Sequence, residues 1–238
     1  MPYCSVGDAN LYYEVHGSGY PVLLIAPGGM NSAIPLWSRA PWNPVPLLSR
    51  HYQVILMDQR NAGRSFGSIR VGDGWHTYLA DQLALLDQLG IARFHVGGMC
   101  IGGAFALALA ALEPSRVSAG LLMQPIGLDD NRQPFFDMYD GWADSLRLER
   151  TDVASEAWSA LREALYGGDF VFAIDRASVR RCATPLLVLA GDDLYHPHPI
   201  SVEIADLAPA ARRIDAWKSP EAHSAAQAAV LDFFAAHG

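Results

Sequence analysis

The 238-residue chain is long enough to bury one sizeable core, and α/β domains of this length commonly form a single unit. Its formal net charge of −8 and its scattered lysine and arginine residues argue against a nucleic-acid partner, because phosphate contacts need clustered positive charge. No secretory signal is visible, and no apolar run approaches the roughly 20 residues of a bilayer span, so we expect a cytoplasmic protein with no membrane partner.

The chain has three cysteines, which are Cys4, Cys100 and Cys182. An odd and widely spaced set of this kind indicates neither a disulfide framework nor a zinc site. We therefore expect reduced thiols, and neither a metal nor a cofactor.

The predicted elements begin with a β-hairpin over residues 3–16, which turns at Gly7-Asp8. Short apolar runs typical of buried strands follow at residues 21–26, 53–57, 94–96, 119–123, 186–190 and 213–217. Helical patterns lie between them, notably at residues 77–89, 104–112 and 224–236. This alternation predicts an α/β fold, with a mostly parallel sheet covered by helices on both faces.

Residues 128–179 interrupt the alternation, because they are rich in aromatic residues and carry no strong strand signal. We predict that they form a small helical cap, inserted into a core made of residues 1–127 and 180–238. The aromatic residues either attach the cap to the core or line an apolar pocket. On the second interpretation the substrate is a small apolar or aromatic molecule, and the predicted substrate-binding residues are Met30, Phe135, Tyr139, Trp142 and Trp158.

The run Gly98-Met99-Cys100-Ile101-Gly102 is typical of a nucleophile elbow in which cysteine replaces the usual serine. Small residues on both sides allow the sharp turn between a strand and a helix. The start of a helix carries partial positive charge, which lowers the pKa of a cysteine at that place. A buried, inert cysteine in a packing turn is the alternative.

An acid and a histidine follow in the order that a catalytic triad needs. Asp193 is preferred to Asp192 as the acid, because it follows a predicted strand and a proline stands four residues later. The predicted base is His223, which stands between the last strand and the terminal helix. His196 and His198 are interpreted as loop residues, and no further ligand cluster supports a metal site at them. Turn formation is the alternative role of the aspartates.

An oxyanion hole needs two N–H donors beside the nucleophile. The N–H of Ile101, directly after the cysteine, is the first predicted donor. The second is expected from the glycine-rich turn after an early strand, with Gly29 preferred to Met30. An ordinary turn at the end of the strand is the alternative.

These motifs together resemble the α/β-hydrolase superfamily over nearly the whole chain. Residues 27–29 stand where the family often has His-Gly, and residues 58–65 resemble its Asp-x-Arg-Gly-x-Gly-x-Ser turn, which is structural. The family order of nucleophile, acid and histidine corresponds to Cys100, Asp193 and His223. A cysteine in the elbow is similar to dienelactone hydrolases and to polyhydroxyalkanoate synthases, although the chain is too short for a synthase. The hairpin and cap are similar to the proline-iminopeptidase-like and lactonase-like branches.

The resemblance implies hydrolysis of carboxylic esters, lactones or thioesters through an acyl-cysteine intermediate. Two alternatives stay open. The same intermediate could pass its acyl group to another acceptor or cyclise, because a thiolate leaves as readily as it attacks. The fold could also serve a non-catalytic protein that binds a small molecule.

Overall fold

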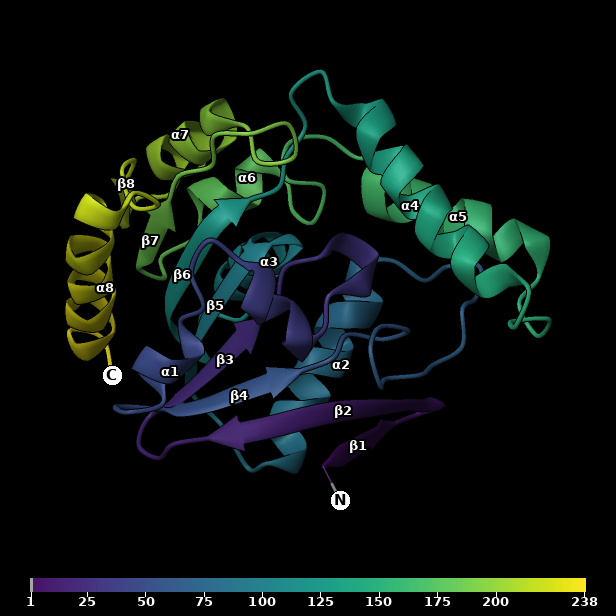
Figure 1. Cartoon of the computed structure of the whole chain (residues 1–238), viewed down its shortest axis with the longest axis horizontal. Coiled ribbons are helices and arrows are strands. Elements are labelled where there is room, and N and C mark those ends of the chain that lie inside the picture. Colours follow the sequence, from purple (N-terminus) through teal and green to yellow (C-terminus); the bar gives the residue numbers. More distant parts are fainter. Residues whose placement is uncertain (1) are drawn as a thin grey trace.

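Residues 2–238 are described by the computed structural model, and their eight strands form a single sheet (Figure 1). The spatial order is β1-β2-β4-β3-β5-β6-β7-β8, with β1 and β2 antiparallel to their neighbours and the other strands parallel. The strands are β1 (Tyr3–Val6), β2 (Ala9–His16), β3 (Pro21–Ile25), β4 (Gln53–Met57), β5 (Phe94–Cys100), β6 (Val117–Pro125), β7 (Leu186–Leu189) and β8 (Ala211–Ile214). The predicted mostly parallel sheet is confirmed.

Helices cover both faces of this sheet because the apolar side chains of each strand alternate between them. Leu23 of β3 packs into the cluster with α2, α3 and α7, while Leu24 packs into the opposite cluster with α1 and α8. The helices are α1 (Val45–Leu48), α2 (Trp75–Gln88), α3 (Ile101–Leu112), α4 (Arg132–Arg147), α5 (Ser155–Tyr166), α6 (Arg176–Arg180), α7 (His198–Leu207) and α8 (Pro220–Ala235), with 3₁₀ turns η1 (Gly29–Asn31) and η2 (Ile34–Arg39). No helix in residues 2–238 is both long and apolar enough to cross a membrane.

The segment between β6 and β7 contains α4, α5 and α6. Helices α4 and α5 pack side by side at one end of the molecule, and α4 also contacts η1 (Figure 1). Helix α6 instead packs against α3 and α7. Within the predicted cap, α4 and α5 therefore form the part that lies over the strand ends, and α6 joins the helices beside the sheet.

The last strand differs from its prediction. β8 begins at Ala211 and ends at Ile214, two residues before the predicted start and three before the predicted end. Trp217 is buried as the prediction requires, but in a loop, where its Nε1–H donates to the backbone oxygen of Ala190 at 2.8 Å. The predicted run therefore contains the end of β8, at Arg213 and Ile214, and the buried Trp217 that follows it is an indole anchored at the end of β7.

The turn after β4 is held by buried charges. The Asp58 carboxylate accepts the backbone N–H groups of Ile34 and Arg64, at 2.8 and 2.9 Å. Arg60 forms a two-pronged ion pair with Asp81, with N–O distances of 2.8 and 2.7 Å. These contacts fix the chain between β4 and α2, which is the structural role expected for the turn at residues 58–65.

A strained turn joins β5 to α3. Cys100 has φ 63° and ψ −123°, which is a left-handed backbone conformation that side chains disfavour. A Cβ atom on Gly98 would lie 2.1 Å from the backbone oxygen of Gly102, and one on Gly102 would lie 2.2 Å from that of Ile25. The glycines of the predicted elbow are thus required by close backbone packing.

We expect Gly102→Ala to lower the free energy of unfolding by about 3 kcal/mol, because the added methyl group overlaps the backbone of β3. Chemical denaturation would measure the change. Gly141→Ala is the matched control, since Gly141 is an exposed position of α4 with nothing within 4 Å of an added Cβ, and alanine should stabilise the helix by about 0.5–1 kcal/mol. Equal stability of the two variants would contradict the tight elbow.

Candidate active site

Cys100 stands where β5 ends and α3 begins, and three neighbouring groups act on its thiol. Burial raises the pKa of Cys100, but the hydrogen bond and charge of His196 and the backbone N–H groups of Gly28 and Ile101 outweigh it. The net pKa lies below the usual value for cysteine. The site therefore favours a thiolate, which is the nucleophilic form.

His196 and Asp193 form a turn directly after β7. The two Oδ atoms of Asp193 lie 2.7 and 2.8 Å from Nδ1 of His196, whose ring nitrogen donates because an ionised carboxylate only accepts. Asp193 Oδ1 also accepts the backbone N–H groups of Tyr195 and His196, at 3.0 and 3.1 Å. The carboxylate thus holds both the ring and the backbone of the turn.

The charges of the three groups support one another. Burial lowers the pKa of His196, but its contacts with Cys100 and Asp193 raise it above the usual value. Burial raises the pKa of Asp193, while its contacts with His196 lower it overall. Nε2 of His196 is buried and has no hydrogen-bond partner in residues 2–238, while the ring lies near enough to Cys100 for the two groups to shift each other's pKa. Each of these net shifts favours the charged form of its group, so the contacts among the thiol, the imidazole and the carboxylate stabilise one another's charges.

The predicted base, His223, lies elsewhere. Pro220 starts α8, and Ser219 caps it by accepting the N–H of Ala222 at 3.3 Å, so His223 lies in the first helical turn and not in a loop. Its ring packs edge-on against Trp42, with 5.8 Å between ring centroids, and it does not line the cavity at the cysteine. The structure does not bring His223 to the predicted nucleophile. The imidazole beside Cys100 is instead that of His196, which was interpreted from the sequence as a loop residue.

The glycine turn after β3 lies beside the nucleophile, and its residues bear on the predicted oxyanion hole. The N–H groups that stabilise the Cys100 sulfur belong to Gly28 and to Ile101, of which Ile101 is also a predicted oxyanion donor. Gly29 lines the same cavity, and both glycines have positive φ, at 117° and 57°. Met30, the second choice, is buried in the core and does not line the cavity.

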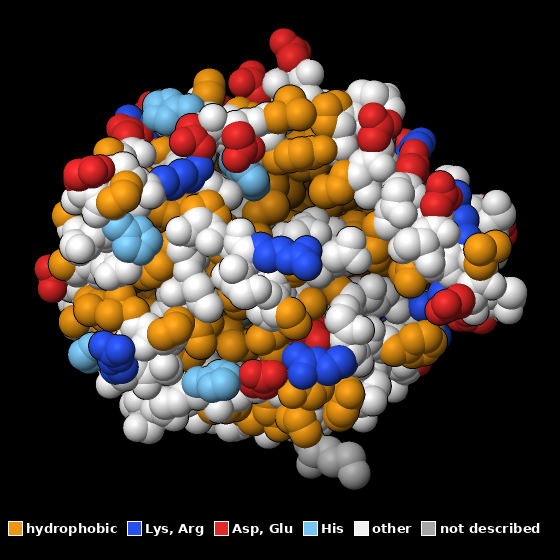
Figure 2. All heavy atoms as spheres, viewed as in Figure 1, with side chains coloured by type: hydrophobic (Ala, Val, Ile, Leu, Met, Phe, Trp, Pro, Cys, Tyr) orange, Lys and Arg blue, Asp and Glu red, His pale blue; other side chains and the backbone are white. Residues whose placement is uncertain are grey.

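An apolar cavity of about 130 Å³ opens beside the cysteine. On the face shown in Figure 2, hydrophobic side chains gather in a hollow between the loop after β7 and α4. The lining residues are Gly28, Gly29, Cys100, Ile101, Ile126, Phe135, Met138, Tyr166, Tyr195 and His196. The candidate nucleophile and base therefore face an apolar cavity.

A comparison with protein families settles the family. Residues 21–172 match the family model of the alpha/beta hydrolase fold. The chain belongs to the α/β-hydrolase family. Within residues 2–238 of this α/β hydrolase, no group of three or more histidine, cysteine, aspartate or glutamate residues could hold a metal ion.

Curated relatives of this α/β hydrolase have several assigned activities. The provisionally named carbamate hydrolase RutD of Azorhizobium caulinodans is 41% identical over 118 residues, which cover 49% of this chain and 42% of that protein. The chain thus spans less than half the length of this relative. The provisionally named non-heme bromoperoxidase BpoC of Mycobacterium tuberculosis is 29% identical over 95% of this chain and 98% of that protein.

Solved structures share the fold over the whole chain. The enol-lactonase of Burkholderia xenovorans LB400 has a TM-score of 0.70 at 24% identity and covers 98% of this chain and 100% of its own. Rv0554 of Mycobacterium tuberculosis has a TM-score of 0.70 at 27% identity, with 96% of this chain and 94% of its own covered. The likeness to the enol-lactonase shows the fold alone.

The predicted substrate-binding residues of this α/β hydrolase separate into two groups. Phe135 lines the cavity. Tyr139, Trp142 and Trp158 do not, because they pack between α4 and α5, where the Tyr139 hydroxyl donates to the backbone oxygen of Trp158 at 2.9 Å. Those three hold the two cap helices together. Sequence reasoning missed Met138, Tyr166 and Tyr195, which line the cavity instead.

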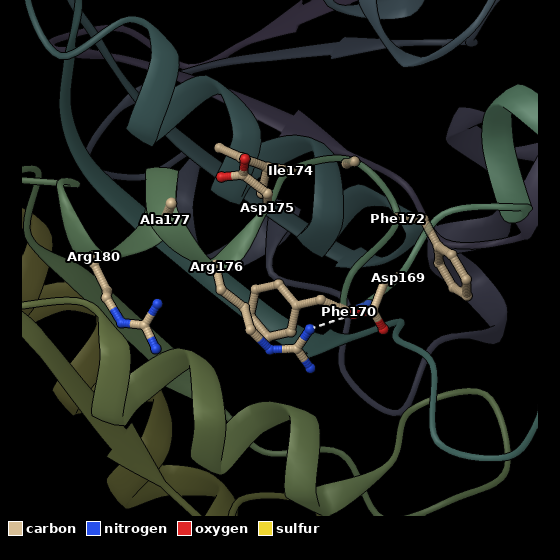
Figure 3. A pocket seen from close by; sticks show the side chains of 9 residues that line it. Asp169, Phe170, Phe172, Ile174, Asp175, Arg176, Ala177 and Arg180 are labelled. Atoms are coloured by element: carbon tan, nitrogen blue, oxygen red, sulfur yellow. Dashed lines mark hydrogen bonds and ion pairs between the residues drawn. The ribbon is translucent and has the colours of Figure 1, made fainter.

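A larger hollow of about 580 Å³ lies beside α6 (Figure 3). Its main cation, Arg176, is already paired with Asp169 and Glu203, each at 2.5 Å, and lies over the ring of Phe170. The lining residues are Asp169, Phe170, Phe172, Ala173, Ile174, Asp175, Arg176, Ala177 and Arg180, and none of them lines the cavity at the cysteine. This hollow is therefore separate from the candidate active site.

Proposed function

We propose that the protein hydrolyses carboxylic esters, lactones or thioesters through an acyl intermediate on Cys100, with His196 as general base and Asp193 as the group that orients it. The observation that carries the proposal is the imidazole of His196, which is joined to the Asp193 carboxylate at Nδ1, lines the same cavity as Cys100 and lowers the pKa of its thiol. The cysteine elbow, which resembles that of dienelactone hydrolases, supports the same chemistry.

Each step has a residue to perform it. The Cys100 thiolate attacks the carbonyl carbon, and the N–H groups of Ile101 and Gly28 stabilise the oxyanion that forms. When the bond to the leaving group breaks, His196 gives its Nε2 proton to the departing oxygen or sulfur. The neutral imidazole then takes a proton from water, whose oxygen attacks the acyl carbon. The C–S bond breaks, and the acid and the thiolate–imidazolium pair are restored.

The relatives support this choice of reaction class. The RutD relative is named for hydrolysis of a carbamate, and the enol-lactonase for that of a lactone, and both reactions break a bond to a carbonyl carbon. A thiolate nucleophile suits the carbonyl carbon of esters and thioesters. The apolar cavity beside it favours uncharged acyl groups over charged ones.

A substrate panel with mass spectrometry tests the proposal. Esters, lactones and thioesters would be offered to the protein, and intact mass spectra taken within seconds should show an acyl adduct on Cys100 that decays as acid appears. The absence of both adduct and acid across the panel would overturn it. Acid as the sole product with a large excess of an alcohol or amine acceptor supports hydrolysis, whereas an acylated acceptor identifies acyl transfer.

The pH dependence of alkylation should reveal the thiolate–imidazolium pair. The lowered pKa of Cys100 keeps the thiolate present below the usual thiol pKa of about 8.5, and the raised pKa of His196 keeps the imidazolium present above about 6.5. We therefore expect the rate of alkylation of Cys100 by iodoacetamide to begin its rise at a lower pH than that of an ordinary thiol. In His196→Ala the rate should instead rise tenfold per pH unit toward the usual thiol pKa. Identical pH profiles would contradict the pairing.

A further inference from the structure

Tyr166 has a buried hydroxyl group with no partner. It is the last residue of α5 and is fully buried, with its ring stacked on Phe135 at 5.4 Å and edge-on to Phe172 at 5.6 Å. No atom in residues 2–238 accepts or donates a hydrogen bond at its hydroxyl oxygen. Leaving such a group unpaired costs about 1–3 kcal/mol, so the unpaired hydroxyl of Tyr166 needs an explanation.

This residue lines the cavity at the nucleophile. Tyr166 and Cys100 are both part of the wall, and they are close enough for the thiolate charge to help raise the pKa of the phenol well above its usual value. Burial is the larger cause of that shift. The hydroxyl therefore keeps its proton throughout the working pH range and is a hydrogen-bond donor with no acceptor in the described residues.

The rest of the wall limits what can occupy the cavity. Its volume of about 130 Å³ is close to that of an apolar cavity that holds benzene, which is about 150 Å³. Apart from Cys100 and His196, none of the described lining residues carries a charge, and Ile126, Phe135 and Met138 make the wall apolar. The space fits a small uncharged acyl group of about six non-hydrogen atoms.

We propose that Tyr166 is a specificity-determining residue, whose hydroxyl donates a hydrogen bond to an oxygen carried by the acyl group of the substrate. The inference rests on the proposed function. The preferred substrates are then esters or thioesters of small acyl groups that bear an uncharged keto or ether oxygen. Binding such a group satisfies the buried hydroxyl, whereas a purely hydrocarbon acyl group leaves it unpaired.

Two matched pairs of N-acetylcysteamine thioesters test the proposal. Methoxyacetyl and butanoyl differ by one oxygen in place of a methylene, and acetoacetyl and 3-methylbutanoyl differ by one oxygen in place of a methyl group. The measured quantity is the ratio of kcat/KM within each pair. In at least one pair, we expect Tyr166→Phe to lower the ratio of kcat/KM for the oxygen-bearing substrate to kcat/KM for the hydrocarbon substrate by about 3- to 10-fold. This is the effect of losing one hydrogen bond.

Tyr78→Phe is the matched control, because the Tyr78 hydroxyl is also buried without a partner in the described residues but does not line the cavity. Its substrate ratios should match the wild type. The thermal midpoint of Tyr166→Phe should not fall, since the variant loses an unpaired group. The proposal is overturned if both ratios stay within twofold of the wild type, if Tyr78→Phe shifts them equally, or if Tyr166→Phe is less stable.

The two proposals fail in different ways. If the wild-type protein forms acyl adducts on Cys100 but Tyr166→Phe leaves both ratios unchanged, the role of Tyr166 is wrong and the proposed hydrolysis stands. If none of the four thioesters, nor the wider panel, gives an adduct or an acid, the proposed function fails, and the role of Tyr166 fails with it.

Discussion

Replacing His196 with alanine is expected to lower kcat/KM for ester or thioester hydrolysis by about 10³-fold. The change removes the only imidazole that lines the cavity among residues 2–238, and with it the proposed base for water and the proposed proton donor for the leaving group. The pKa of Cys100 should also rise, because His196 is the side chain that lowers it. Steady-state kinetics, together with the yield of acyl adduct, would measure both effects.

His223→Ala is the control for this experiment. His223 lies in the first turn of α8 against Trp42 and outside the cavity, so kcat/KM should stay within about twofold of the wild type. The opposite pattern, with His223→Ala inactive and His196→Ala active, would return the role of base to the residue first predicted from sequence order. Circular dichroism would confirm that both variants fold.

Replacing Cys100 with alanine should have the largest effect, a loss of about 10⁴-fold or more in kcat together with complete loss of the acyl adduct. Without a nucleophile the oxyanion donors of Ile101 and Gly28 can only polarise the carbonyl group. Cys100→Ser should also lose most activity, because an alcohol is not ionised by the contacts that lower the pKa of a thiol. Undiminished turnover by the serine variant would show that the site does not depend on a thiolate.

The other two cysteines are the controls for labelling. Cys4 and Cys182 are both buried, and burial raises the pKa of each thiol. Cys4→Ala and Cys182→Ala should therefore keep both the adduct and the sensitivity to alkylation. Adduct formation that persists in Cys100→Ala would place the reactive thiol at one of these two residues.

The central strands β3 to β7 could be predicted from sequence because they are buried on both faces and mainly apolar. Periodicity could not locate β8, since that strand is only half-buried and carries Arg212 and Arg213, while the apolar Trp217 lies outside it. The elbow was predictable from its glycines. Glycine is required at positions 98 and 102 because the backbone of Gly102 lies against Gly98 and the backbone of Ile25 lies against Gly102.

The candidate base could not be predicted from chain order. His223 has the expected position in the chain, but the Ser219-Pro220 signature of a helix start draws it into α8. The useful signal was local. Asp193 and His196 are three residues apart in a turn at the end of β7, a spacing at which a carboxylate reaches the imidazole of its own turn. The cap aromatics were ambiguous for a similar reason, because spacing does not distinguish helix packing from cavity lining.

The turn from Asp193 to His196 has a consequence for how the protein can vary. Acid and base usually have to be kept in alignment by separate segments, whereas here a single four-residue turn carries both and its own backbone bonds fix their distance. The connection between β8 and α8, residues 215–219, then has no catalytic group to position. Insertions into that connection that keep Trp217 against Ala190 and Ser219 at the start of α8 should therefore leave the alignment of the proposed acid, base and thiol intact.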